Sequence, residues 1–293
     1  MVNRMSELRI KQLRYEFTYP GEIFLHRDVP TITFRGAFGY ALAQVIARQA
    51  NVPEFSEQVA LYKNIFSPCN DGDSNSRNHD LARPFVLRGW YNRPDRRSFI
   101  LDVHLFGCAT EYEHFFDTVI ETISYMGIGK MNQVCRLNKI FSVMLDIREQ
   151  PPDNFLKVKF ISPCIRMKSD GELFLDEIPF YTLFARLADR LRELESLYED
   201  GNTFSRDEEL FELKHQAKMY LAKKLDGGHY QTIRHSGRTA QTMYLDGFLG
   251  TMGYCGDFIP YQKYLKYLPY INLGRFNVFG CGWCEMSYLK NII

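Results

Sequence analysis

The sequence predicts an α+β fold made of two tandem units, each with an element order close to βαββαβ. Both halves of the chain alternate strand-like and helix-like segments, and both close on a helix, a glycine loop and a last strand. The closing phrases are "GIGKMNQVCRL" (127–137) and "NLGRFNVFGCGWCEM" (272–286). Between the halves, "REQPPDNF" (148–155) places two prolines among polar residues, which is typical of a linker. We therefore expect one domain over residues 1–150 and a second over residues 151–293.

The first half contains three strand-like and two helix-like segments. Alternating apolar residues predict strands over residues 8–19 and 97–107, and a further extended segment covers residues 134–147. Apolar residues at helical spacing predict helices over residues 34–49 and 110–127.

The second half repeats this alternation of strands and helices, with one additional helix inserted. We expect a strand over residues 155–167 and a helix over residues 179–198, followed by an inserted helix over residues 207–225. Glycines at intervals within residues 230–258 predict a long β-hairpin there. We expect a short helix over residues 259–271, followed by the glycine loop and the last strand. The order in each half is that of the ferredoxin-like, or RRM-like, unit.

Composition limits the class of protein. Seven cysteines, an odd number scattered along 293 residues, predict reduced thiols and a cytoplasmic protein. No apolar run reaches the ~20 residues of a membrane span, so no membrane partner is expected. The net charge of +1 neither requires nor excludes nucleic acid, but arginines and lysines concentrate in residues 77–97 and 214–290.

The pair Cys281 and Cys284 has the spacing of a thiol-redox motif. A redox pair needs a following helix to lower the first thiol's pKa, and "CEMSYLKNII" does not resemble a helix. In a strand the two side chains would point to opposite faces, and a zinc site would need two further ligands. We therefore expect core cysteines, no metal and no cofactor, with a thiol oxidoreductase as the alternative from another class.

The glycines around this pair are more informative. Gly274, Gly280 and Gly282 surround Arg275, and glycine permits positive φ and close backbone approach. Exposed N–H groups beside an arginine can bind a phosphate, so we expect an anion site here. The preceding hairpin adds the basic residues Arg234, His235 and Arg238.

Five phrases in order carry a resemblance to a known family. They are "FRGAFGYAL" (34–42), "FILDVHLFGCATEYEHFFDTVIETISYMGIGK" (99–130), "VKFISPCIRMKSDGEL" (158–173), "RHSGRTAQTMYLDGFLGTMGYCGDF" (234–258) and "LGRFNVFGCGW" (273–283). Together they resemble the CRISPR-associated endoribonucleases that process precursor CRISPR RNA, the Cas6 family of the RAMP superfamily. The resemblance runs over almost the whole chain and agrees with the tandem units predicted above.

The resemblance implies an activity. Such proteins bind the repeat in a CRISPR transcript and cut once per repeat without a metal. The ribose 2′-OH attacks the adjacent phosphate and leaves a 2′,3′-cyclic phosphate and a 5′-OH. This reaction needs a base for the 2′-hydroxyl, an acid for the leaving oxygen, and donors or cations for the phosphorane charge.

The resemblance also points to catalytic residues. His26 lies between the first strand and the first helix, where the family commonly places its catalytic histidine. Tyr40, on the predicted helix, could orient the 2′-OH or assist as an acid or base. No lysine occurs between residues 27 and 50, so Arg35 or Arg48 would have to stabilise charge. His235 is the rival general base, although we favour it as an RNA contact.

The resemblance leaves two functions open. One is the ribonuclease, whose expected RNA contacts are Arg35, Lys130, Arg234, His235, Arg238, Gly274, Arg275, Gly280 and Gly282. The other is a RAMP subunit that holds CRISPR RNA in an effector complex without cutting it. The sequence leaves open whether the chain acts as a monomer, a homodimer or a subunit of such a complex.

Overall fold

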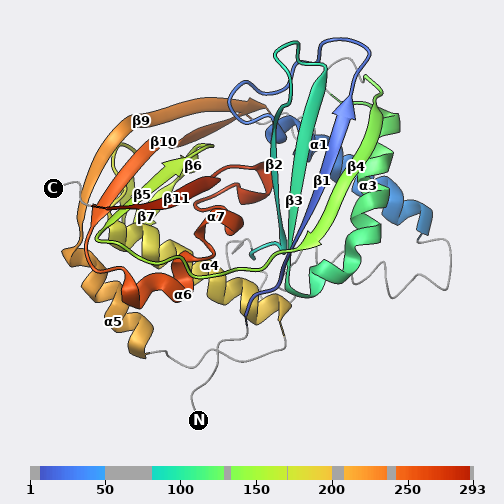
Figure 1. Ribbon diagram of the computed structural model, residues 1–293. Helices are drawn as coiled ribbons and strands as arrows, with labels where there is room; N and C mark the ends of the chain where they lie inside the picture. The colour runs from blue at the N-terminus through green and yellow to red at the C-terminus, as the bar shows by residue number, and fades with distance from the viewer. Residues whose placement is uncertain are drawn as a thin grey trace, which may run out of the picture. The chain divides into compact units, whose positions relative to one another are not determined.

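The chain forms two compact units, residues 1–145 with 193–202 and residues 146–192 with 203–293 (Figure 1). Both combine an antiparallel sheet with helices, so the predicted α+β class is confirmed. The computed structural model describes residues 7–49, 81–128, 133–169, 171–199, 208–235 and 242–290.

In its described residues, the first unit has a four-stranded sheet and two long helices. Its elements are β1 (Ile10–Thr18), α1 (Thr31–Gln49), β2 (Phe85–Tyr91), β3 (Ser98–Phe106), the 3-10 helix η2 (Gly107–Tyr112), α3 (Glu113–Met126) and β4 (Arg136–Met144). The strand order is β2-β3-β1-β4, so β1 has an antiparallel neighbour on each edge. The element order is that of the ferredoxin-like unit, as predicted, and the strand order agrees with this fold.

Aromatic side chains fill the space between this sheet and α1. Phe34 of α1 lies 4.7 Å from Phe17 of β1 and 5.3 Å from Phe99 of β3, measured between ring centroids. Phe38, one helical turn later, lies 5.5 Å from Phe85 of β2. All five side chains are buried, and burying each one stabilises the fold by roughly 1.5–3 kcal/mol. This packing fixes the helix, and therefore the loop that leads into it.

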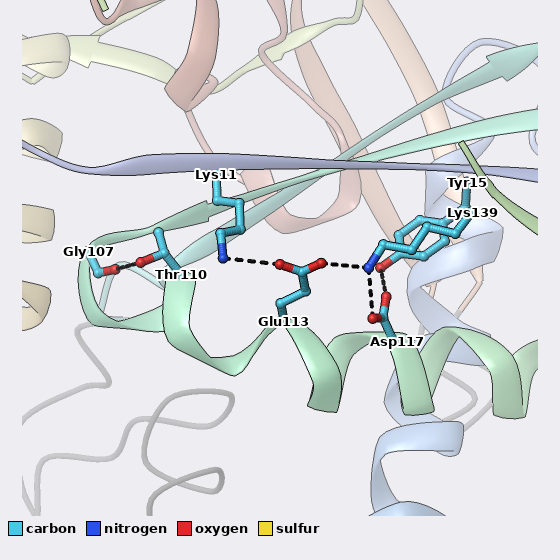
Figure 2. Close-up of polar contacts among 7 residues, drawn as sticks. All are labelled: Lys11, Tyr15, Gly107, Thr110, Glu113, Asp117 and Lys139. Atoms are coloured by element: carbon cyan, nitrogen blue, oxygen red, sulfur yellow. Dashed lines mark hydrogen bonds and ion pairs between the residues drawn. The ribbon is translucent and has the colours of Figure 1, made fainter. Parts of the chain in front are cut away.

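A chain of ion pairs joins α3 to the sheet on its β1–β4 side (Figure 2). Lys139 Nζ of β4 donates to Glu113 Oε1 at 2.6 Å and to Asp117 Oδ2 at 2.7 Å. Lys11 Nζ donates to Glu113 Oε2 at 3.0 Å, and the Tyr15 hydroxyl donates to Asp117 Oδ1 at 2.6 Å. Each carboxylate thus faces a lysine, which lets charged residues lie between a helix and a sheet.

The second half of the chain contributes a larger sheet. Its elements are β5 (Phe155–Phe160), β6 (Cys164–Ile165), β7 (Met167–Ser169), β8 (Glu172–Phe174), α4 (Phe180–Tyr198), α5 (Glu208–Gln216), β9 (Leu221–His235), β10 (Thr242–Cys255), α6 (Gln262–Leu265), α7 (Leu268–Ile271) and β11 (Cys284–Leu289). β11, β5 and β10 are successive neighbours, and β6 and β9 also pair with β10. β7 and β8 form a separate two-stranded hairpin.

Three sequence-based assignments are wrong in detail. β2 was not expected, because Phe85–Arg88 is a continuously buried run without the alternation that signals a strand. The inserted helix ends at Gln216, since residues from Leu221 onward pair with β10 and tertiary pairing overrides helix propensity. The short helix over residues 259–271 is divided into α6 and α7, with Pro269 in the first turn of α7.

The segment between α7 and β11 folds back on β6. Leu273 N–H donates to Gly282 O at 2.9 Å, Gly282 N–H donates to Pro163 O at 2.9 Å, and Arg275 N–H donates to Ile165 O at 2.8 Å. Gly282 has φ +76°, and a Cβ at this position would lie 1.7 Å from Leu273 O. Glycine is therefore required at position 282 by backbone contact.

The ion pairs of Figure 2 predict an acid-sensitive component of stability. Desolvation raises the pKa of Glu113, but hydrogen bonds from Lys139, Lys11 and Ser142 outweigh it and lower the pKa from 4.5 to about 2. The stabilisation is therefore complete above pH 4.5 and is lost as the pH falls towards 2. We expect the urea midpoint of the wild type to fall more steeply across this window than that of Glu113→Gln. Equal slopes would contradict the assignment.

The Gly282 geometry predicts a large effect of one methyl group. Gly282→Ala should lose about 3 kcal/mol of unfolding free energy, because it combines a left-handed conformation with a clash against backbone. The matched control is Gly21→Ala, where no atom lies within 4 Å of the added Cβ and φ is not positive. Denaturant unfolding of both variants measures the difference, and similar midpoints would show that the loop adjusts freely.

Candidate functional site

Connections from distant parts of the sequence meet at one end of the first sheet. β1 ends at Thr18, which pairs with Ser98 at the start of β3 and with Arg136 at the start of β4. This pairing places the β1–α1 connection, residues 19–30, beside the β2–β3 turn, residues 92–97. The α3–β4 connection arrives at the same end. His26 lies in the first of these connections.

The β1–α1 connection is held by the end of β2 and by the β2–β3 turn. The Tyr91 hydroxyl accepts a hydrogen bond from Leu25 N–H at 2.9 Å and donates one to Ile23 O at 3.2 Å. Ile23 N–H in turn donates to Arg96 O at 3.2 Å. The backbone on the N-terminal side of His26 is therefore fixed from outside the loop.

His26 itself is fixed by the start of α1. Its backbone N–H donates to Thr33 Oγ1 at 3.1 Å, and Val29 N–H donates to His26 Nδ1 at 3.2 Å. Because Nδ1 is an acceptor, the neutral ring carries its proton on Nε2. Desolvation of the half-buried ring lowers its pKa, and the Asp28 carboxylate opposes this only in part. The site therefore favours a neutral imidazole with an N–H at Nε2.

Tyr40 and Arg35 lie on α1, and their surroundings differ. Tyr40 is 61% exposed and follows Thr33 by seven residues, so it lies on the same helix face, roughly 10 Å further along the axis. Among the described residues no hydrogen bond joins Tyr40 to His26. Arg35 is half-buried and runs along the helix, where its Nη1 would lie 2.8 Å from a Cβ at position 39.

Exposed arginines surround the His26 connection. They are Arg27, Arg93, Arg96 and Arg97. Within the described residues, Arg27 pairs with Asp28 at 3.8 Å and Arg96 pairs with Glu22 at 4.0 Å. Exposed pairs this long interact weakly, so the arginines remain available to an anionic ligand.

The predicted contacts on the hairpin are only partly described. Arg234 and His235 end β9, where their backbones pair with Met243 and Thr242 of β10. Arg238, and Lys130 in the α3–β4 connection, lie outside the described residues. Their contact with RNA stays a prediction.

The glycine loop does not present its N–H groups as the sequence analysis expected. Gly280 and Gly282 are buried, and their N–H groups donate to Asn277 O and Pro163 O, both at 2.9 Å. Gly274 is half-buried, and a Cβ there would lie 2.5 Å from Ile165 O. These glycines serve close packing of the loop in this fold.

Two arginines offer charge at this loop instead. Arg275 is exposed, and its backbone pairs with Ile165 of β6. Arg166, the next residue after Ile165, is exposed too and has φ +51°. Sequence reasoning missed Arg166, because only the pairing of Ile165 with Arg275 reveals that the two arginines are neighbours.

The two cysteines of the C-terminal motif are core residues. Cys281 lies in the turn before β11 and Cys284 begins β11, and both are buried. The expectation that a strand directs them to opposite faces is therefore wrong, since Cys281 is not in the strand. Burial, with Cys284 and Cys281 nearby, raises the pKa of the Cys164 thiol well above its ordinary value, which is opposite to the shift of a reactive thiol.

The described residues give two further facts about site type. No three of their histidine, cysteine, aspartate and glutamate side chains form a group that could hold a metal ion. None of their helices is both long and apolar enough to cross a membrane.

Comparison with known proteins identifies relatives of both halves. Residues 158–284 match the family model of the CRISPR-associated endoribonuclease Cas6, and residues 8–152 match a family model described as an N-terminal domain. No curated protein sequence matches the chain.

Solved structures extend the similarity over the fold. Thermus thermophilus Cas6 is similar with a TM-score of 0.53 and 11% identity, covering 96% of this chain and 100% of that chain. A Cas6b crystal structure (TM-score 0.39, 12% identity, 95% and 100% coverage) and Thermus thermophilus Cse3 bound to an RNA representing a pre-cleavage complex (0.33, 11%, 94% and 99%) score lower. The resemblance to the Cas6 family that the sequence predicts is confirmed by the family match over residues 158–284, and the first structure shows a similar fold.

Proposed function

We propose, on the premise that residues 158–284 belong to the CRISPR-associated endoribonuclease Cas6 family, that this chain binds CRISPR repeat RNA and cleaves precursor CRISPR RNA. The reaction is attack of a ribose 2′-OH on the adjacent phosphate, which breaks the bond to the 5′-oxygen. The products are a 2′,3′-cyclic phosphate and a 5′-OH. No metal is required, because a side chain and backbone-fixed donors can stabilise the phosphorane.

The observation that carries this proposal is the fixed imidazole of His26. Its Nδ1 accepts Val29 N–H and its backbone N–H donates to Thr33 Oγ1, in a loop that lies among exposed arginines. A half-buried ring fixed by hydrogen bonds is oriented before substrate arrives, which is what charge stabilisation in a transition state requires.

The hydrogen bonds of His26 suggest its role in the reaction. Nε2 presents an N–H, so the ring donates a hydrogen bond to the phosphate or to the leaving 5′-oxygen. Acting as the base instead would require Nδ1 to leave Val29 N–H and release the lone pair. We therefore assign His26 to stabilising the leaving side of the reaction, and we place Tyr40 and Arg35 along the RNA path on α1.

RNA binding would draw on both units. Arg275 and Arg166 supply adjacent exposed cations at the glycine loop, which suits contact with the phosphate backbone. Lys130, Arg234, His235 and Arg238 are proposed as further contacts. We assign Gly274, Gly280 and Gly282 the task of holding Arg275 in place.

One observation favours the second candidate, a subunit that binds CRISPR RNA without cutting it. The lone pair of His26 Nδ1 is already used by Val29 N–H, so the neutral ring has no second lone pair for the 2′-hydroxyl proton. Tight binding of repeat RNA with no product would establish this alternative.

The cleavage proposal predicts the behaviour of His26→Asn. The asparagine amide can accept Val29 N–H in place of Nδ1 but has no group at the position of Nε2. We expect cleavage of repeat RNA in EDTA to fall at least ~100-fold while RNA affinity stays within about twofold. The assay maps the product ends of wild type and variant. Unchanged cleavage would remove His26 from the site.

The same geometry predicts the stability of two His26 variants. His26→Ala leaves Val29 N–H without its acceptor and should lower the free energy of unfolding by about 1 kcal/mol, whereas His26→Asn should lower it by less than about 0.5 kcal/mol.

The lowered pKa of His26 predicts a pH dependence of stability. Below the ordinary histidine pKa of 6.5, the unfolded chain binds more protons than the folded chain. Wild-type stability should therefore fall as the pH drops below 6.5, and His26→Asn should lack this component. Urea unfolding at several pH values measures both effects. Identical pH profiles would contradict the lowered pKa.

A further inference from the structure

Phe24 is a large aromatic side chain that the fold leaves in solvent near His26. Its side chain is 68% exposed, whereas Phe17, Phe34 and Phe99 of the same unit are buried. Only Leu25 separates Phe24 from His26, so their Cα atoms lie within about 7 Å of each other. A ring this exposed contributes little to the core of the unit.

The ring of Phe24 is nevertheless supported from one side. The guanidinium carbon of Arg96 lies 5.9 Å from the centroid of Phe24 and 5.6 Å from the centroid of Tyr91. Tyr91 also fixes the loop on either side of Phe24, through Ile23 O and Leu25 N–H. One cation thus bridges the exposed ring to a ring that belongs to β2, which limits the motion of Phe24.

We propose that Phe24 stacks on an unpaired nucleobase of the RNA, next to the phosphate that His26 contacts. The position relative to the phosphate rests on the proposed function. Because the Cα atoms lie within about 7 Å, or about two base steps of ~3.4 Å, the stacked base belongs to a nucleotide within about two positions of that phosphate. The ligand is therefore the face of a single-stranded base at the reacting end of the sheet.

The charges around Phe24 decide between a nucleic acid and a protein partner. Arg27 is 94% exposed in its side chain, and Arg93, Arg96 and Arg97 are exposed as well. An apolar protein surface would have to desolvate these cations on binding, whereas an RNA strand places phosphates beside them and a base on the ring. Aromatic stacking tolerates every base but requires that the base is not paired. Phe24 would thus make the enzyme prefer unpaired RNA at its reacting phosphate.

The test measures binding, so it does not depend on cleavage. The full chain carrying His26→Asn is titrated with repeat RNA from the source genome, labelled with 2-aminopurine at single positions along the repeat. We expect quenching at one or two adjacent positions, lost in Phe24→Ala together with roughly tenfold of the affinity. Phe24→Trp should retain both, whereas Phe24→Leu, which keeps apolar area without a π face, should lose both.

A matched control separates stacking from the loss of any exposed phenylalanine. Phe211 on α5 is 75% exposed, and Phe211→Ala should bind repeat RNA as the parent does. Equal affinity of Phe24→Ala and Phe211→Ala, with quenching intact, would overturn the proposal. So would an equal effect of Phe24→Leu and Phe24→Trp.

The outcomes also separate this inference from the proposed function. If the wild-type chain cleaves repeat RNA but Phe24→Ala binds it unchanged, only the stacking proposal is overturned. If Phe24→Ala loses quenching and affinity although the wild-type chain never cleaves, stacking is supported and the nuclease proposal is overturned. If neither the wild-type chain nor the His26→Asn chain binds repeat RNA, both proposals are overturned.

Discussion

The antiparallel pairing of β1 with both β3 and β4 is the constraint on which the candidate site depends. It brings Thr18, Ser98 and Arg136 together at one end of the sheet, and the connections of the unit follow from there. The Tyr91 hydroxyl reaches Leu25 across 66 residues of sequence. His26 is thus positioned by strand register as much as by its own loop, and a change of register would separate it from β2.

Much of the fold could be predicted, because its elements carry their own periodicity. α3 buries Phe115, Phe116, Val119, Ile120 and Ile123 on one face, which is the stripe that helical spacing predicts. β2 carries no such pattern, since a strand that is buried on both faces reads as a continuous apolar run. The start of β9 is likewise decided by its partner β10 and not by local propensity.

The candidate site was predictable in one part only. The resemblance pointed to His26. The hydrogen bonds that hold His26 and set the tautomer of its ring follow from the folded structure. So do the contacts of Tyr91 and Arg96 with the neighbouring residues of its loop. Glycine content was read correctly as a sign of positive φ, and Gly274, Gly280 and Gly282 all have it. Whether such a turn faces solvent or protein depends on what packs against it, and here β6 packs against it. Sequence spacing cannot distinguish these two cases.

The two units share one arrangement, in which the last strand pairs with the central strand of the sheet. In the first sheet, β1 ends beside the start of β4, as Thr18 pairs with Arg136; in the second, β5 ends beside the start of β11, as Phe160 pairs with Cys284. The connection before the last strand therefore reaches the end of the central strand in both units. A ferredoxin-like unit gathers loops at that end because its central strand is paired on both edges. Duplication of such a unit thus duplicates a place where loops can carry cations, and divergence can then assign different chemistry to each copy. In this chain the first copy has the fixed imidazole, and the second has a loop held on the sheet by its own backbone with Arg275 and Arg166 at its surface.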